Sequence, residues 1–358
     1  MKLIIENGIL TGYVPEENMK SLVIPDTVTA IAPRAFYRCK SLEELIIPGT
    51  VKEIGEESFA ESGLIKLILQ NGIDAIGTAA FADCHNLTQV SLPDSLRIIG
   101  PSAFQRTGLK ELILPKKLEE IGDSAFQGGF YSKYVDDDWT LIDDIVFPDS
   151  LKKIGEKAFR CLNCEKVILP GSLLELGKGA FMESNMRYVY IPGSLKEIPV
   201  IAFAECLDLH YVKIDAGVEA IGFEAFSGCI ELQTLEIAPG LKRIECNAFR
   251  YCMSLKEVIL PDGLLALEDS AFYGCEDLER VVFPSTLKCI GSDPHIPLLG
   301  ELETTWETIE LHLGVFEQCK NLKEFMIPEG VEKIGYNAFE GCPCNDRVKH
   351  RRNVVCNS

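Results

Sequence analysis

The sequence predicts a repeat solenoid that is mainly β, with short strands joined by short turns or by 3-10 or helical pieces. The first observation is a sequence motif that occurs four times, with small variations, between Phe203 and Pro284: AFAECLDLHYVKI, AFSGCIELQTLEI, AFRYCMSLKEVIL and AFYGCEDLERVVF. The second is that the phenylalanines of these copies are 23 residues apart. A fixed period of this length indicates stacked repeats, because one unit cannot bury its apolar edge alone.

The third observation is that the same phenylalanine recurs thirteen times along the chain. The set is Phe36, Phe59, Phe81, Phe104, Phe126, Phe159, Phe181, Phe203, Phe226, Phe249, Phe272, Phe316 and Phe339. The steps are 22 or 23 residues except for two, of 33 and 44 residues. Insertions that keep the register on both sides belong in loops, since a shift inside a strand would turn its buried face outward.

Each repeat contains the pattern of two short strands and a corner. In residues 42–59, Leu45 and Ile47 alternate inward as a strand, and the next residue is a proline, which cannot donate to a β-ladder. After a turn, Val51 and Ile54 bury a second short segment, and Phe59 fills the corner. We therefore expect two strands and one buried ring per repeat.

These residues resemble a known family. The pattern Leu-x-x-Leu-x-Ile-Pro-x-x-Val-x-x-Ile-Gly-x-x-Ala-Phe-x-x-Cys is similar to the leucine-rich repeat of the BspA-like type, from about Met19 to Cys342. The resemblance implies a right-handed curved solenoid with a parallel sheet on its concave side, here with thirteen repeats of 22–23 residues. It also implies interaction or adhesion roles, mostly in bacteria and some parasitic protists, and no catalytic residues. The chain departs from the pattern locally, with Gln70 and Ala216 in place of Pro, and Ser62, Thr107, Gly129 and Ser184 in place of Cys.

The repeats also predict the domain organisation. Residues 1–18 contain an Asn7-Gly8 pair between two apolar segments, which predicts a β-hairpin that caps the first repeat. The array follows over residues 19–342, with insertions at 128–144 and 292–313, and residues 343–358 form a C-terminal tail.

Composition limits the partners and the compartment. The chain has 35 basic and 54 acidic residues, a net charge of −19, which argues against nucleic acid or an anionic lipid surface as a partner. It contains no apolar run of 18 residues, so no membrane insertion is expected. The first eleven residues do not have the pattern of a signal peptide. These features favour a cytoplasmic location; the alternative is the cell surface, by a route not readable here or with an export signal missing from this chain.

Eight of the fourteen cysteines occupy one repeat position, three residues after the phenylalanine. They are Cys39, Cys84, Cys206, Cys229, Cys252, Cys275, Cys319 and Cys342. We expect a ladder of buried thiols that bond to the backbone of the adjacent turn, because Ser and Thr replace Cys at this position. Disulfides between neighbouring repeats are the alternative, since the repeat spacing falls within the Cα distances that a disulfide allows.

The outward-facing position of the first strand suggests a binding surface. Ten of its thirteen residues are apolar: Val23, Ile46, Ile68, Ile113, Val146, Ile168, Tyr190, Ile259, Val282 and Met326. Such a stripe is unusual for a surface, although β-branched residues also suit a sheet whose polar neighbours cover them. Tyr188, Tyr190, Tyr211, Lys213 and Glu236 interrupt it, and tyrosine-rich surfaces are typical of protein recognition. We predict binding there; an ordinary cross-strand cluster is the alternative.

The two tryptophans lie in the insertions. Trp139 and Trp306 are predicted as further contact residues, or as anchors that hold each insertion on the body of the protein. The second insertion has apolar residues at steps of three and four, which favours a short amphipathic helix. No metal or cofactor is expected: the Asp residues at 136–138 lack the spacing of a calcium loop, and the cysteines with His350 in the tail match no standard zinc motif.

The sequence therefore predicts a non-catalytic scaffold that holds a protein or peptide on its concave face, with a role in adhesion or host and cell-surface contact. The alternative is a structural protein that self-associates through the apolar stripe or its C-terminal end. An enzyme is not expected, because none of the five histidines has a recognisable nucleophile or base beside it in the sequence.

Overall fold

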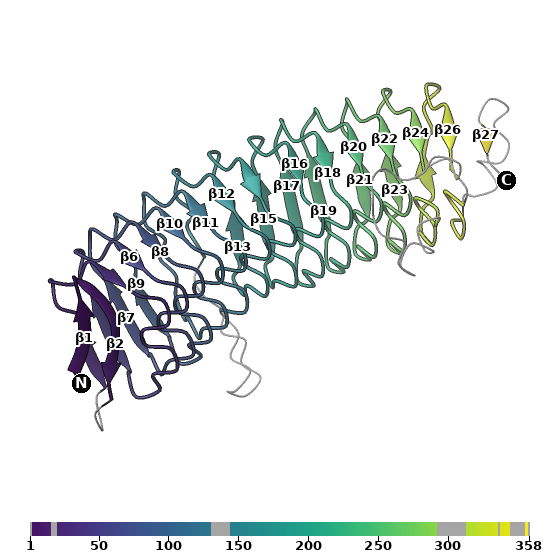
Figure 1. Cartoon of the computed structure of the whole chain (residues 1–358). Coiled ribbons are helices and arrows are strands. Elements are labelled where there is room, and N and C mark those ends of the chain that lie inside the picture. Colours follow the sequence, from purple (N-terminus) through teal and green to yellow (C-terminus); the bar gives the residue numbers. More distant parts are fainter. Residues whose placement is uncertain are drawn as a thin grey trace. The chain divides into compact units, whose positions relative to one another are not determined.

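The computed structural model describes residues 2–15, 20–129, 144–291, 313–335, 337–343 and 355–356. The chain forms two compact units, Met1–Met186 and Arg187–Ser358. In each unit short parallel strands stack in two rows, so that one turn of the chain lies on the next (Figure 1). The predicted parallel β-solenoid is thus confirmed.

In the first unit the two strands of each repeat form separate sheets. The first strands are β3 (Ser21–Val23), β5 (Glu44–Ile47), β7 (Lys66–Leu69), β9 (Gln89–Ser91) and β13 (Lys166–Ile168). The second strands are β4 (Ala30–Ile31), β6 (Glu53–Ile54), β8 (Ala75–Ile76), β10 (Ile98–Ile99), β11 (Glu120–Ile121), β12 (Lys153–Ile154) and β14 (Glu175–Leu176). We call the two surfaces the first sheet and the second sheet.

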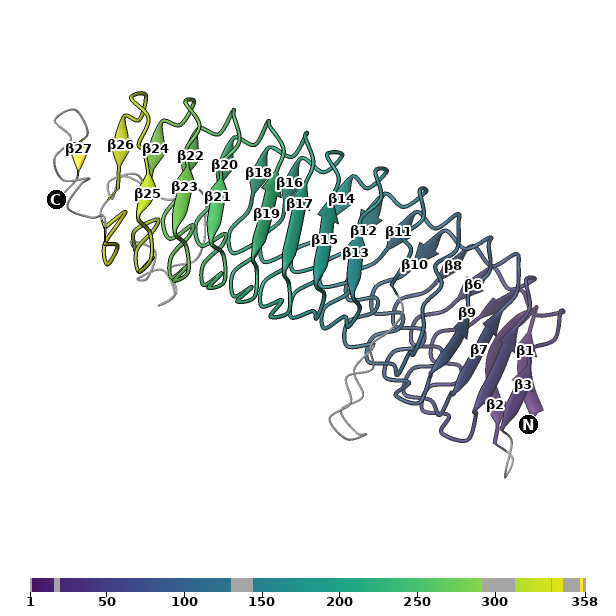
Figure 2. The same ribbon diagram turned by 180° about the vertical axis from the view of Figure 1, so that it is seen from behind.

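The second unit repeats this arrangement, and Figure 2 shows its two rows of strands. The first sheet contains β15 (Tyr188–Ile191), β17 (Tyr211–Ile214), β19 (Thr234–Ile237), β21 (Glu257–Ile259), β23 (Arg280–Val282) and β25 (Glu324–Phe325). The second sheet contains β16 (Glu197–Ile198), β18 (Ala220–Ile221), β20 (Arg243–Ile244), β22 (Ala266–Leu267), β24 (Cys289–Ile290), β26 (Lys333–Ile334) and β27 (Val355–Cys356).

The thirteen phenylalanines are the core of the fold. All are at most 2% exposed, and within each unit the rings stack in one column. Neighbouring centroids are 5.0–5.5 Å apart in the first unit and 5.2–5.5 Å apart in the second. Phe126 stacks on Phe159, and Phe272 on Phe316, although an insertion separates each pair in sequence. The insertions therefore leave the repeat register unchanged, as predicted.

Consecutive turns, not helices, form the corner around each phenylalanine. No helix occurs among the described residues, and the residue two after the phenylalanine has a positive φ in every repeat, for example 60° at Arg38 and 57° at Glu205. This conformation aims alternate N–H groups at the next repeat: Phe36 N donates to Ser58 O at 2.7 Å, and Arg38 N donates to Ala60 O at 2.9 Å. The corner is thus a third hydrogen-bonded surface that the hydrophobic pattern did not predict.

Six of the eight ladder cysteines form the hydrogen bond expected of them. Cys206 Sγ donates to Ala204 O of its own turn at 4.0 Å, and Cys39 Sγ lies 3.9 Å from Ser41 Oγ. Each of six ladder thiols donates to the carbonyl of the phenylalanine one repeat earlier, at 3.0–3.4 Å; the donors are Cys84, Cys229, Cys252, Cys275, Cys319 and Cys342. Ser184 replaces Cys and makes the equivalent bond to Phe159 O at 3.1 Å. Burial raises the pKa of the Cys84 thiol to about 11, so this thiol stays protonated and able to donate.

The first sheet is interrupted beside the first insertion. Among the described residues, 109–114 and 144–147 contain no strand, although the repeat pattern predicts one in each. At this interruption Lys166 N donates to a side chain, Asp144 Oδ1, at 2.8 Å. The bond links β13 to residue 144, where the preceding repeat forms no strand.

A hairpin begins the chain, as the Asn7-Gly8 pair predicts. Strands β1 (Lys2–Glu6) and β2 (Ile9–Val14) are antiparallel, and both turn residues have positive φ. β2 pairs in parallel with β4, and the Tyr13 ring stacks on Phe36 at 4.9 Å. Tyr13 therefore covers the first ring of the column.

Candidate functional site

The predicted tyrosines lie together on the first sheet of the second unit. Parallel pairing places Tyr188 of β15 beside Tyr211 of β17, and Tyr190 beside Lys213 and then Glu236 of β19. Val189 and Val212, between them, are fully buried, so the alternation of the strands turns the tyrosines outward. All five predicted residues thus occupy adjacent positions on one surface.

The two outer tyrosines stack on each other. The Tyr188 and Tyr211 rings have centroids 4.9 Å apart and planes 10° apart, an arrangement favourable for aromatic rings. Tyr188, Tyr190, Tyr211 and Lys213 are half-buried, and Glu236 is exposed. The rings are therefore fixed in place while part of each remains accessible.

Carboxylates hold two of the phenols. The Tyr190 hydroxyl donates to Asp215 Oδ2, and this bond raises the pKa of Tyr190 to about 12. Desolvation, together with a hydrogen bond to the Glu236 carboxylate, raises the pKa of Tyr211 to about 12. Both phenols are therefore neutral donors at physiological pH. We name Tyr188, Tyr190, Tyr211, Lys213, Asp215 and Glu236 the tyrosine patch.

Asp215 is the member that sequence reasoning missed. It follows the last residue of β17, where the repeat usually turns, so the inward–outward alternation did not include it. The available signal was that Asp215 lies two residues after Lys213, which itself pairs with Tyr190 of the preceding strand. The arrangement offers amphipathic rings, a cation and two carboxylates, which suits contact with a polypeptide rather than bond-breaking chemistry.

The apolar stripe is exposed over part of its length. In the first unit Ile113 is 78% exposed, Val146 79% and Ile168 53%, whereas Ile46 and Ile68 are half-buried. In the second unit Ile259 is 56% and Met326 79% exposed. Neighbouring side chains thus cover some members, and the most exposed pair in the first unit, Ile113 and Val146, lies within the interruption of the sheet.

Several predicted features lie outside the described residues. Trp139, Trp306, the helix expected in the second insertion, and His350 of the tail are in this class. They stay predictions. Among the residues that the structure does describe, no group of three or more His, Cys, Asp or Glu side chains is arranged to hold a metal ion.

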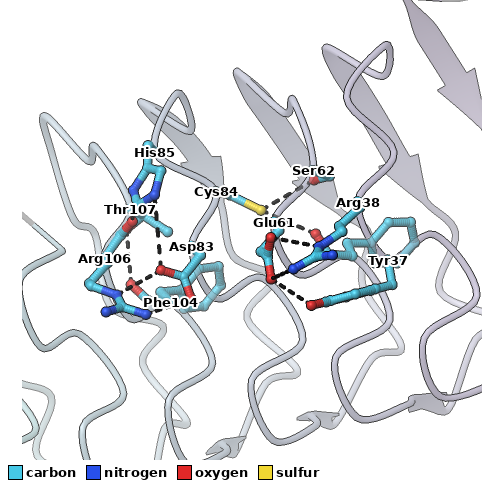
Figure 3. A network of polar contacts seen from close by, with 11 residues as sticks. Tyr37, Arg38, Glu61, Ser62, Asp83, Cys84, His85, Phe104, Arg106 and Thr107 are labelled. Carbon is cyan, nitrogen blue, oxygen red and sulfur yellow. Dashed lines mark hydrogen bonds and ion pairs between the residues drawn. The ribbon is translucent and has the colours of Figure 1, made fainter. Parts of the chain in front are cut away.

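A second polar cluster lies at the phenylalanine corner of the first unit (Figure 3). Arg38 Nε and the Tyr37 hydroxyl both donate hydrogen bonds to the Glu61 carboxylate, at 2.8 and 2.5 Å. The guanidinium of Arg34 lies 4.4 Å from the Tyr37 ring centroid. These bonds, that of Arg38 first, lower the pKa of Glu61 to about 2.

Further along the same corner, Arg106 Nε lies 2.6 Å from Asp83 Oδ1 (Figure 3). Each cation in these contacts faces a carboxylate of the neighbouring repeat, so the charges are matched within the protein. The cluster ties adjacent corners together, and we assign it no ligand.

The comparisons with known proteins agree with this architecture. The model of the BspA type leucine rich repeat region matches the chain in six copies, over residues 13–131, 138–241, 196–295 and 298–354. The chain belongs to this family. The resemblance noted in the repeat pattern is therefore confirmed over nearly the whole chain.

Solved structures of leucine-rich repeat proteins are similar to this one. A leucine rich cell surface protein from Faecalibacterium prausnitzii is 24% identical, with a TM-score of 0.50; the match covers 90% of this chain and 91% of that one. A leucine-rich repeat protein from Bacteroides ovatus is 26% identical, with a TM-score of 0.54 and coverage of 86% and 84%. No curated protein sequence matches the chain. In the described residues, no helix has the length and apolar character needed to cross a membrane.

Proposed function

We propose that the chain is a non-catalytic scaffold that binds a protein or peptide on the first sheet of its second unit, through the tyrosine patch. The observation that supports it best is the Tyr188–Tyr211 stack, in which Glu236 holds the Tyr211 phenol while Asp215 holds that of Tyr190 beside it. Ordering a flexible side chain at an interface costs free energy, and here that ordering precedes binding. The repeat family, which typically serves as an interaction or surface scaffold, supports the same function.

We also propose that this binding takes place at the cell surface, in adhesion or a related contact. The cytoplasmic location expected from the residues has no support in the comparisons, whereas the similar protein from Faecalibacterium prausnitzii is described as a cell surface protein. Surface biotinylation of intact cells, with a cytoplasmic protein as control, tests this location. Labelling only after lysis would contradict it.

The binding function can be tested without knowing the natural partner. Peptides are selected from a displayed library on the immobilised wild-type protein, and their affinities are then measured for the variant Tyr188→Ala/Tyr211→Ala. Loss of a central aromatic pair typically removes at least about 2 kcal/mol, so we expect binding to weaken by about 30-fold or more.

The chain offers a matched control. Tyr251 and Tyr273 form another tyrosine pair in the same unit, 5.5 Å apart, at the phenylalanine corner rather than on the first sheet. The variant Tyr251→Ala/Tyr273→Ala should bind the selected peptides like the wild type. Equal affinity of wild type and Tyr188→Ala/Tyr211→Ala, or failure to enrich any peptide, would argue against the patch as a binding site.

A further inference from the structure

The N-terminal hairpin leaves one strand edge open. In the sheet β1-β2-β4-β6, strand β1 is at the end, so within the described residues no strand pairs with its outer side. Ile4 and Ile5 of this strand are 41% and 37% exposed. An exposed apolar edge strand presents unpaired N–H and C=O groups, and is the usual place where another strand adds to a sheet.

The backbone of β1 is regular enough to take such a strand. The register shifts between Ile4, which faces Gly12, and Ile5, which faces Leu10, so the extra residue is Thr11 of β2 and not a residue of β1. The Thr11 hydroxyl donates to the Ile4 carbonyl at 3.2 Å, which places the polar groups of Ile4 toward β2. Those of Leu3 and Ile5 consequently point to the open edge, because alternate residues of a strand bond to opposite sides.

The residues of β1 are complementary to themselves when a second β1 runs antiparallel. With Ile4 opposite Ile4 of the other copy, Leu3 lies opposite Ile5, and Lys2 opposite Glu6. Lys2, Ile4 and Glu6 share one face of the strand, so both charge pairs form on the same side of the joined sheet. A shift by two residues in either direction shortens the overlap and separates the opposite charges.

We propose that β1 is a homodimer interface, in which two copies of the chain join their N-terminal sheets edge to edge. The two-fold axis passes between Ile4 of one copy and Ile4 of the other. The outward groups of Leu3 and Ile5 exchange four backbone hydrogen bonds, and Lys2 of each copy pairs with Glu6 of the other. The same patch thus serves both copies, as a two-fold interface requires. This surface contains no residue of the tyrosine patch, so the inference is independent of the proposed binding function.

A five-residue edge buries less surface than a standard stable interface, so we expect a weak dimer, with self-association over roughly 10 µM to 1 mM protein. Sedimentation velocity over this range measures it on the whole chain. Lys2→Glu alone, or Glu6→Lys alone, places two like-charged pairs across the interface and should weaken dimerisation about tenfold. The double variant Lys2→Glu/Glu6→Lys exchanges the charges, and should restore the wild-type association.

A second experiment tests the register directly. At a non-hydrogen-bonded antiparallel pair the Cα atoms are about 4.5 Å apart, within disulfide range. The variant Ile4→Cys should therefore form a disulfide-linked dimer under mild oxidation, visible on a non-reducing gel. The control is Ile98→Cys, at a residue of β10 that is similarly exposed, 43%; neither this variant nor the wild type should form a disulfide-linked dimer.

The outcomes are separable. Concentration-dependent dimerisation that the single charge reversals weaken and the double variant restores supports the interface. A protein that stays monomeric at 1 mM overturns it, as does self-association that neither single reversal changes. Cross-linking of Ile98→Cys to the same extent as Ile4→Cys also overturns the proposed register.

Discussion

Single residues can replace a feature of the repeat, and Glu268 is an instructive case. It stands where many repeats have glycine, such as Gly55 and Gly77, and its Oε2 accepts a hydrogen bond from Cys246 N at 3.3 Å and from the Cys246 thiol at 3.5 Å. Burial raises the pKa of the Glu268 carboxyl, and the nearby negative charge of Glu245 raises it further. The side chain therefore satisfies a backbone donor at the cost of placing a charge in a poorly solvated position.

The variant Glu268→Gln should be more stable than the wild type at pH 7–8, and the difference should disappear near pH 4. The pKa of Glu268 in the folded state lies above its unfolded value, so ionisation of this carboxyl disfavours the folded state. The stability contributed by the protonated side chain is fully present below the unfolded pKa and is lost as pH rises through the folded pKa. Gln keeps an acceptor oxygen for Cys246 N and carries no charge. Urea unfolding at several pH values measures the difference.

Glu245 provides the control for this prediction. It occupies the same position one repeat earlier, but Arg243 Nη2 lies 2.7 Å from its Oε1. Glu245→Gln removes an ion pair rather than a desolvated charge, and should not stabilise the protein at neutral pH. Equal stabilisation by both substitutions would show that lower net charge, and not the burial of Glu268, is responsible.

At the scale of the element, the cysteine ladder couples the strand–turn unit of one repeat to the corner of the one before. Cys252 Sγ donates to Phe226 O at 3.4 Å, and the thiol is buried beneath the turn. Phe226 O also accepts from Cys229 N at 3.4 Å, so the thiol adds a second hydrogen bond to this buried carbonyl, from the next repeat. Most ladder positions accordingly carry a small side chain with a donor, and Gly129 is an exception.

Replacing Cys252 tests this requirement. Cys252→Ser should leave stability nearly unchanged, because Ser184 makes the same bond in the first unit, whereas Cys252→Ala removes one hydrogen bond and should lower the free energy of unfolding by about 0.5–1.5 kcal/mol. Chemical denaturation of both variants gives the comparison. If Ser destabilised as much as Ala, the thiol would act through its size and apolar character instead of its hydrogen bond.

The element scale also shows the limit of sequence reasoning. The two strands and the ladder follow from apolar alternation and from Ser replacing Cys, so both were predictable. The corner turns were not, because only four of the thirteen positive-φ positions after the phenylalanine are glycine; Arg38, Glu205 and Tyr251 carry no local signal for that conformation. Tertiary hydrogen bonds impose the left-handed backbone there, against a cost of about 1–2 kcal/mol per residue.

At the scale of the whole molecule, the 22–23-residue period determined most of what was predictable. It placed the phenylalanine column and brought Tyr188, Tyr190, Tyr211, Lys213 and Glu236 together, because residues at equivalent repeat positions become neighbours in a parallel stack. It did not predict the interruption of the first sheet at 109–114 and 144–147, where an insertion breaks the ladder while the phenylalanine register continues. Nor did it predict the Tyr190–Asp215 bond, since that contact joins different repeat positions.

A stack of this kind should lose stability locally, according to which neighbours a substitution removes. Tyr13 contacts only one column ring, Phe36, whereas Phe81 lies between Phe59 and Phe104, at 5.4 Å from each. Nearest-neighbour stacking predicts that Tyr13→Ala opens the first repeats without exposing later ones. Phe81→Ala should lower the free energy of unfolding by about 3–5 kcal/mol, and should expose the repeats on both sides of the missing ring.

Hydrogen exchange read by mass spectrometry, at protein concentrations below 10 µM so that self-association is minimal, distinguishes these responses. Tyr13→Ala should speed exchange in β4, β5 and β6, and should leave β10 and β11 as protected as in the wild type. Phe81→Ala should speed exchange in β7, β8, β9 and β10 together, because both faces of the missing ring had a partner. Uniform loss of protection across the first unit in both variants would mean that this unit unfolds as one cooperative block, and that stacking between neighbours does not set its local stability.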